Sequence, residues 1–214
     1  AIGGAHGLAV TCELTDMEQP LGMAVGNALE VKEAIAALRG EGPADLVRLV
    51  RLAGAEMLVR GRRARAVASA LARIDRAIAD GSGLAKLREL VAAQGGDARL
   101  VDEPSRLPVA PRVEVLRAPR TAYVAAIAAD RIGVASVRLG AGREKKGDPI
   151  DLRTGILLRA KVGDRVERGA PYAEVHAAGR ASDAQAIELV RAAVRWSGAR
   201  VARRRLVLGR IASR

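Results

Sequence analysis

Apolar residues recur at helical spacing through most of the first half of the chain. This spacing is typical of amphipathic helices. It predicts helices from about Met23 or Val25 to Leu38 and over residues 43–61, 62–79 and 84–93, separated by glycine-containing breaks. The helix over residues 43–61 carries the clearest apolar stripe, at Leu46, Leu49, Val50, Ala53, Met57 and Leu58. A short apolar run at residues 8–14 predicts a buried strand before the first of these helices.

The pattern changes after residues 97–111, which contain three prolines and are typical of a linker. Alternating or short apolar segments then predict strands over residues 112–116, 122–127, 156–161, 172–176 and 205–211. Helices are expected over residues 130–139 and 182–196. The sequence therefore predicts an α/β protein with a helix-rich first part, residues 1–103, and an α+β second part, residues 104–214.

Composition favours an aliphatic core and leaves the role of the positive charge open. Half of the residues are hydrophobic, but only Tyr123, Tyr172 and Trp196 are aromatic. The net charge of +12 comes mainly from arginine, which suits either a phosphate-bearing partner or solvated helix faces. No aromatic residues interleave with the arginines, as they often do on nucleic-acid surfaces, so we expect no nucleic-acid partner.

The single cysteine and the N-terminus carry little functional information. Cys12 excludes an intrachain disulfide, and its apolar neighbours favour a buried small side chain over a nucleophile. No segment has the length and purity of a membrane-spanning helix, and no export signal is visible. We expect a cytoplasmic protein without a membrane partner. The opening Ala1-Ile-Gly-Gly without Met is consistent with a chain that starts mid-protein.

One loop has the composition of an oxygen-rich cation site. Residues 14–35 read LTDMEQPLGMAVGNALEVKEAI. Gly22 and Gly26 allow tight turns that direct peptide carbonyls inward, and Glu33 follows on the first turns of the next helix. Carbonyl and carboxylate oxygens are ligands for hard cations. Spacing alone also permits an ordinary loop with a surface glutamate.

The same run resembles, at nearly every position from 15 to 35, the signature segment of pyrimidine-nucleoside and thymidine phosphorylases. These pentosyltransferases cleave a pyrimidine nucleoside with inorganic phosphate to the free base and a pentose 1-phosphate. The resemblance implies a potassium-type cation held by the carbonyls of Leu21 and Ala24 and the carboxylate of Glu33. The family's remaining ligands come from an earlier glycine-rich loop without a counterpart here, so the site in this chain is incomplete.

Two later segments are similar to the C-terminal domain of the same enzymes. They are LGAGREKKGDPID at residues 139–151 and VGDRVERGAP at residues 162–171. The second also resembles biotinyl- and lipoyl-type barrel-sandwich folds, in which a lysine at a hairpin tip carries the cofactor. Lys161 lacks the flanking residues usual in such carriers. The loop at Gly140–Arg143 is either a phosphate cradle or, as we favour, a flexible surface loop.

The resemblance implies the second half of a phosphorylase α/β domain followed by an α+β C-terminal domain with a small barrel-sandwich-like sheet. The family's phosphate, base and catalytic motifs belong to its earlier half, so we assign no catalytic or substrate-binding residue here. Full-length members are expected to use phosphate and a pyrimidine nucleoside and to form homodimers, whereas this chain alone is expected to be inactive. The alternatives are a non-catalytic scaffold or binding module derived from the family and, less favoured, a carrier domain.

Overall fold

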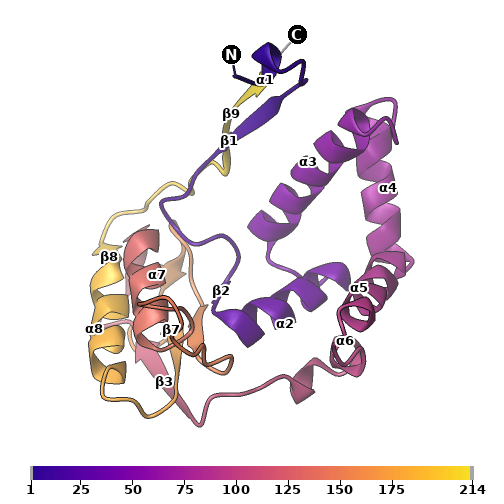
Figure 1. The fold of residues 1–214 in the computed structure, drawn as a ribbon. Coiled ribbons are helices and arrows are strands. Elements are labelled where there is room, and N and C mark those ends of the chain that lie inside the picture. Colours follow the sequence, from indigo (N-terminus) through magenta and orange to yellow (C-terminus); the bar gives the residue numbers. More distant parts are fainter. Residues whose placement is uncertain (1, 213–214) are drawn as a thin grey trace.

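The computed structural model describes residues 2–212 and has a mixed α/β architecture (Figure 1). The helices are α1 (Ile2–Ala5), α2 (Asn27–Leu38), α3 (Ala44–Arg60), α4 (Val67–Ala79), α5 (Ser82–Ala93), α6 (Arg99–Asp102), the 3-10 turn η1 (Pro104–Arg106), α7 (Ala129–Arg138) and α8 (Asp183–Ala193). The strands are β1 (Thr11–Thr15), β2 (Ala24–Val25), β3 (Arg112–Arg117), β4 (Ala122–Ile127), β5 (Gly155–Leu158), β6 (Arg165–Val166), β7 (Pro171–Ala177), β8 (Val194–Ser197) and β9 (Val207–Ala212).

The described strands form three small, open, antiparallel sheets. Their orders are β1-β9, β2-β5-β7-β3 and β6-β4-β8. The last two lie with the paired helices α7 and α8 in a compact C-terminal unit (Figure 1). The mixed α/β class is therefore confirmed, whereas the finer description as a barrel-sandwich stays a prediction.

The main hydrophobic core lies in this C-terminal unit and is aliphatic, as the composition predicts. Ile132 of α7, Ile156 of β5 and Val175 of β7 are completely buried. Tyr172 and Trp196 meet edge to face at its margin, with ring centroids 5.2 Å apart and an interplanar angle of 86°. This core provides most of the buried apolar surface that stabilises the described chain.

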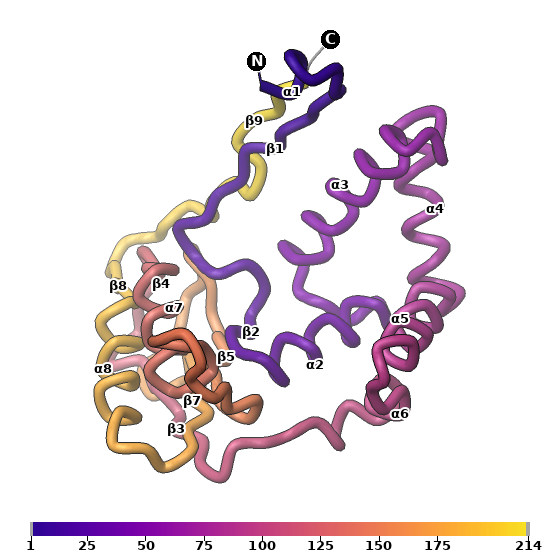
Figure 2. The backbone as a smooth tube through the Cα atoms, in the orientation of Figure 1, coloured from indigo at the N-terminus to yellow at the C-terminus, as the bar shows by residue number. Residues whose placement is uncertain are grey.

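The helical part forms an extended arm with a thin core. Figure 2 shows the backbone running out along α2 and α3 and returning along α4 and α5. Among its apolar residues, Ile35, Ala55 and Ala70 are buried. Val50 and Met57 of the predicted stripe are 50% and 74% exposed, so part of this apolar stripe is uncovered in the described chain. No helix within residues 2–212 is long and apolar enough to cross a membrane.

Four local expectations are corrected by the structure. The strand expected at residues 8–14 is observed as β1, but it is not buried. It pairs with β9, and its residues alternate between partly buried and exposed. Cys12 is exposed. The helix expected to reach residue 196 ends at Ala193, and the chain continues as β8, which pairs with β4. The strand expected over residues 156–161 ends at Leu158.

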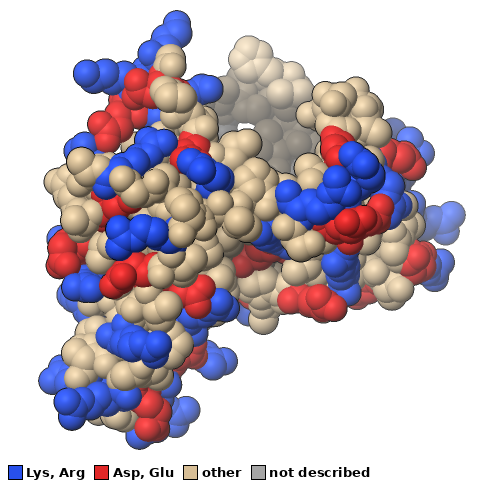
Figure 3. Space-filling model, turned by 90° about the horizontal axis from the view of Figure 1, so that it is seen from below, with Lys and Arg blue, Asp and Glu red and all other residues tan. Residues whose placement is uncertain are grey.

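Charges of both signs are mixed on the surface. On the face drawn in Figure 3, Lys and Arg alternate with Asp and Glu and do not gather into one basic patch. Across the described surface, exposed pairs such as Arg51–Asp75 and Arg88–Asp102 bring opposite charges together. On that face the net charge of +12 is thus dispersed over solvated side chains.

Two strands of the first part pair with strands of the second part. β1 pairs with β9, and β2 adds an edge to the C-terminal sheet by pairing with β5. Gly26 and Gly155 meet at this second pairing: a Cβ on Gly155 would lie 2.5 Å from the Val25 carbonyl and 3.1 Å from the Gly26 Cα. Only glycine permits so close an approach of two backbones.

We predict that Gly155→Ala destabilises the protein by about 2–4 kcal/mol, because the added methyl group must push two backbone segments apart. Gly133→Ala is the matched control, since Gly133 lies inside α7 and an added Cβ meets nothing within 4 Å. Alanine is the better helix former, so this control should be more stable by about 0.5–1 kcal/mol. Urea unfolding of both variants checks the prediction, and a Gly155→Ala variant as stable as the wild type would contradict it.

Candidate functional site

Residues 16–27 of the predicted signature segment contact the C-terminal unit. They run from the end of β1 through β2 to the first residue of α2, and we call them the junction loop. The Gln19 Oε1 atom accepts a hydrogen bond from the Val162 amide at 3.1 Å, and the Met23 carbonyl accepts one from Leu158 at 2.7 Å. Asn27 donates from Nδ2 to the Ala141 carbonyl at 2.8 Å. The loop is thereby fixed at both ends and in the middle.

Glu33 turns back from α2 onto the junction loop. Its Oε1 atom accepts hydrogen bonds from the amides of Met23 at 2.8 Å and Ala24 at 3.0 Å. Its Oε2 atom lies over Gly22, where an added Cβ would be only 2.1 Å away. Gly22 has a φ of +66°, which also favours glycine. The carboxylate and the loop conformation therefore depend on each other.

Partial burial raises the pKa of the Glu33 carboxyl above its ordinary value. The hydrogen bonds from Met23 and Ala24 oppose this rise, the nearby Asp45 carboxylate adds to it, and the Lys161 ammonium reduces it. An additional positive charge beside such a carboxylate favours its ionised form.

Lys161, in the turn between β5 and β6, is the cation closest to this arrangement in the described chain. Its Nζ atom donates to the carbonyls of Pro20 and Gly22, the second at 2.7 Å. It also lies 2.8 Å from the Asp45 carboxylate at the start of α3. We call Lys161, Asp45 and these two carbonyls the Lys161 cluster.

Asp16 and Arg204 form a second link between distant parts of the chain. The Asp16 side chain is only 5% exposed and pairs with the Arg204 guanidinium through both of its oxygens, one of them 2.8 Å from Nη2. Chiefly through this hydrogen bonding, Arg204 lowers the pKa of the Asp16 carboxyl. The arginine run 203–205 predicts only a solvated face, and no sequence pattern links Arg204 to an aspartate 188 positions away.

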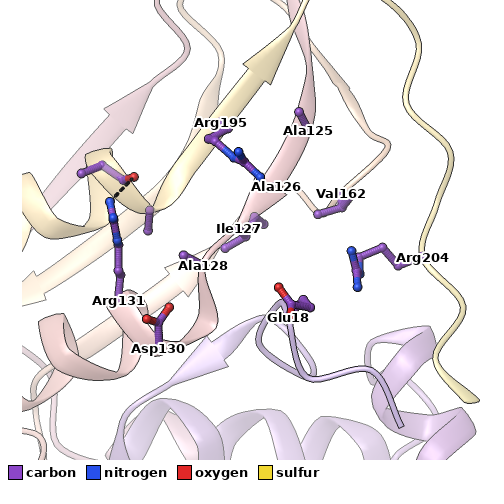
Figure 4. Close-up of a pocket in the computed structure, with 12 residues that line it drawn as sticks. Glu18, Ala125, Ala126, Ile127, Ala128, Asp130, Arg131, Val162, Arg195 and Arg204 are labelled. Carbon is purple, nitrogen blue, oxygen red and sulfur yellow. Dashed lines mark hydrogen bonds between the residues drawn. The ribbon is translucent and has the colours of Figure 1, made fainter. Parts of the chain in front are cut away.

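Two cavities flank the junction loop. One of about 390 Å³ lies between the loop, β4 and the end of α8. Figure 4 shows Glu18 and Arg204 on one side of it, Asp130 and Arg131 on another, and Arg195 beside Ala126. The mixed charges give this cavity no clear preference for an anion. The second, of about 440 Å³, is lined by Gln19, Met23, Asp45, Lys161 and Arg203 among others.

One of the expected cation ligands, Glu33, lies against the junction loop that carries the other two, Leu21 and Ala24. The Met23 carbonyl points toward β5, and carbonyls alternate along a strand, so the Ala24 carbonyl points away from β5. Cation binding by Leu21, Ala24 and Glu33 itself stays a prediction. Residues 2–212 contain no group of three or more His, Cys, Asp or Glu side chains able to hold a metal.

Lys161 does not have the environment of a cofactor-carrying lysine. Its side chain is 15% exposed, and its ammonium already has three oxygen partners. The loop at residues 140–147 has exposed tips at Arg143 and Lys145, as expected of a surface loop. Asp148 closes it by accepting the Lys145 amide at 2.8 Å.

Comparison with known proteins agrees with the motifs. The family described as pyrimidine nucleoside phosphorylase C-terminal domain matches residues 123–197. A pyrimidine-nucleoside phosphorylase of Bacillus subtilis (strain 168) is 46% identical over 176 residues, which is 82% of this chain and 41% of that protein. The chain is homologous to the pyrimidine-nucleoside phosphorylases. This confirms the resemblance to the family, and the matched domain includes the similar segments at residues 139–171.

Other relatives show the same partial coverage. The pyrimidine-nucleoside phosphorylase of Geobacillus stearothermophilus is 44% identical over 168 residues, covering 78% of this chain and 39% of that protein. That of Staphylococcus epidermidis is 43% identical over 175 residues, covering 82% and 40%. The chain thus spans about two-fifths of the length of these relatives, and the matched domain is consistent with a C-terminal part of the family.

We predict that Gly22→Ala costs about 2–4 kcal/mol of unfolding free energy, because it displaces the Glu33 carboxylate and strains the backbone. Gly95→Ala is the matched control: its φ is +78° and an added Cβ meets nothing within 4 Å, so only the backbone strain of about 1 kcal/mol remains. In a Glu33→Ala background, Gly22→Ala should cost no more than this control. An unchanged cost in that background, measured by urea unfolding, would contradict the assignment.

The pH dependence of Glu33→Gln follows from the raised pKa of Glu33. A raised pKa in the folded state means that the carboxyl stabilises the fold fully below its ordinary pKa of 4.5. This contribution is lost as the pH rises through the folded value. In potassium-free buffer, the Tm of wild type minus that of Glu33→Gln should therefore fall between pH 4 and pH 7. A difference that grows over this range would contradict the burial of the carboxylate.

Proposed function

We propose that this chain provides the cation loop and the C-terminal domain of a pyrimidine-nucleoside phosphorylase, a cytoplasmic pentosyltransferase acting on thymidine or uridine. The observation that carries the proposal is the junction loop. A nearly complete family signature, residues 15–35, adopts a defined shape in which Glu33 is fixed on the loop by two amides. This conformation supports the proposal, because it holds the Glu33 carboxylate against the loop that carries Leu21 and Ala24.

In such an enzyme the chain positions a bound cation and contributes the C-terminal domain. Phosphorolysis brings together an attacking phosphate, a cationic sugar and a departing pyrimidine anion, so preorganised charges lower its barrier. When bound, a potassium-type cation supplies fixed positive charge that links this loop to another part of the enzyme. The carbonyls of Leu21 and Ala24 and the Glu33 carboxylate are the groups that would hold it, and their oxygens suit a hard cation.

Exposed apolar side chains support the proposal that a further part of the enzyme packs against this chain. Leu14 of β1 and Leu208 and Ile211 of β9 are 49–61% exposed, and Val50 and Met57 of α3 are exposed as well. Two-stranded sheets are marginally stable alone, and exposed apolar patches mark interaction surfaces. We propose that the part of the relatives not matched by this chain covers these residues and supplies the phosphate- and base-binding groups.

The test is phosphorolysis with and without that part. The chain alone should release no uracil or thymine from a nucleoside in phosphate buffer. Fusion to the unmatched N-terminal part of the Bacillus subtilis relative should restore release, and replacing choline by potassium at constant ionic strength should raise its activity. Glu33→Gln in the fusion should lose the potassium effect.

Two outcomes would contradict the proposal. Release of base by the chain alone would show that it carries its own catalytic groups. A soluble, folded fusion without activity would favour a non-catalytic scaffold derived from the family.

A further inference from the structure

Lys161 reaches from the C-terminal unit into the first part of the chain, where its ammonium makes two hydrogen bonds and an ion pair. An ammonium group has three hydrogens and no acceptor. Its three partners are the carbonyl of Pro20, the carbonyl of Gly22 at 2.7 Å and the carboxylate of Asp45 at 2.8 Å. The side chain is 15% exposed, so the charge is largely withdrawn from water.

The three partner oxygens form a set that would suit a free cation. Two peptide carbonyls and one carboxylate are hard ligands, and a charge withdrawn from water is tolerated only when it is paired. We propose that Lys161 is a tethered cation. Its ammonium fills this three-oxygen site and fixes the junction loop in the shape in which Glu33 meets the amides of Met23 and Ala24.

The surroundings hold the ammonium in advance. The Lys161 amide donates to the Asp164 carboxylate at 3.0 Å, and the Asp164 amide donates back to the Lys161 carbonyl at 3.0 Å, which fixes the turn. The Asp45 oxygen that pairs with Lys161 also accepts the Gly22 amide at 3.3 Å. The junction loop, the start of α3 and the β5–β6 turn therefore meet at a single charge.

This role is distinct from the proposed cation site. Lys161 uses the carbonyls of Pro20 and Gly22, whereas Leu21, Ala24 and Glu33 are the expected ligands of the mobile cation. The inference also goes beyond the proposed function, because a tethered cation stabilises the loop without substrate or potassium. Its failure would leave the proposed phosphorolysis untouched.

Chemical rescue tests the proposal. Lys161→Ala removes three carbons and the ammonium, and n-propylammonium replaces those same groups. The variant should lose about 6 °C or more in Tm, because Asp45 and two carbonyls are left without their cation. Millimolar n-propylammonium chloride should restore at least half of the loss, whereas tetramethylammonium, which has no N–H, should not. Lys145→Ala, in the exposed loop, is the control and should keep the wild-type Tm in every salt.

A measurement on the unmodified chain covers the case in which Lys161→Ala fails to fold. Under an amine-acylating reagent, Lys161 should react about tenfold or more slowly than Lys32, Lys86, Lys145 and Lys146, because reaction requires local opening of its site. Equal reactivity would overturn the proposal. So would a wild-type Tm for Lys161→Ala, or a loss that n-propylammonium does not reverse.

Discussion

The contact of the junction loop with β5 and the β5–β6 turn is the interaction on which the rest of the structure depends. It combines a partly buried ion pair, a short strand pairing and two glycines that allow backbones to touch. Each component alone is modest in free energy. Together they connect a helical arm with a thin core to a unit that holds most of the buried apolar surface.

This contact also explains why a phosphorylase signature segment has its unusual composition. Gly22 leaves room for the Glu33 carboxylate, and Gly26 leaves room for Gly155. Gln19 and Asn27 use their side chains to hold the C-terminal unit. The segment therefore serves the docking of two parts of the chain as well as the cation binding that its family resemblance implies.

Local patterns predicted the elements whose stability is local. The helices α2, α3, α5 and α7 were found within a few residues of their expected bounds, because helical spacing and glycine breaks can be recognised directly in the sequence. The strands β2, β6 and β8 were missed, because two to four residues carry no period of their own and become strands only beside β5 and β4. The boundary between α8 and β8 was missed because Val194 and Trp196 continue the apolar spacing.

The site was predictable only in part for the same reason. Glu33 and the junction loop are close in sequence, so their proximity could be inferred from spacing and resemblance. Lys161 is 116 positions from Asp45, and no pattern in the chain connects them. The exposed face of β1 escaped prediction as well, since hydrophobic spacing indicates which residues can be buried but not whether a partner is present.

Hydrogen exchange at single amides tests the docking of the junction loop most directly. The account predicts that the amides of Met23, Ala24, Leu158 and Val162 open together, with protection similar to that of the C-terminal core at Val175. Fast exchange of Met23 and Ala24, at the rate of the outer helices α4 and α5 and independent of Leu158 and Val162, would contradict it.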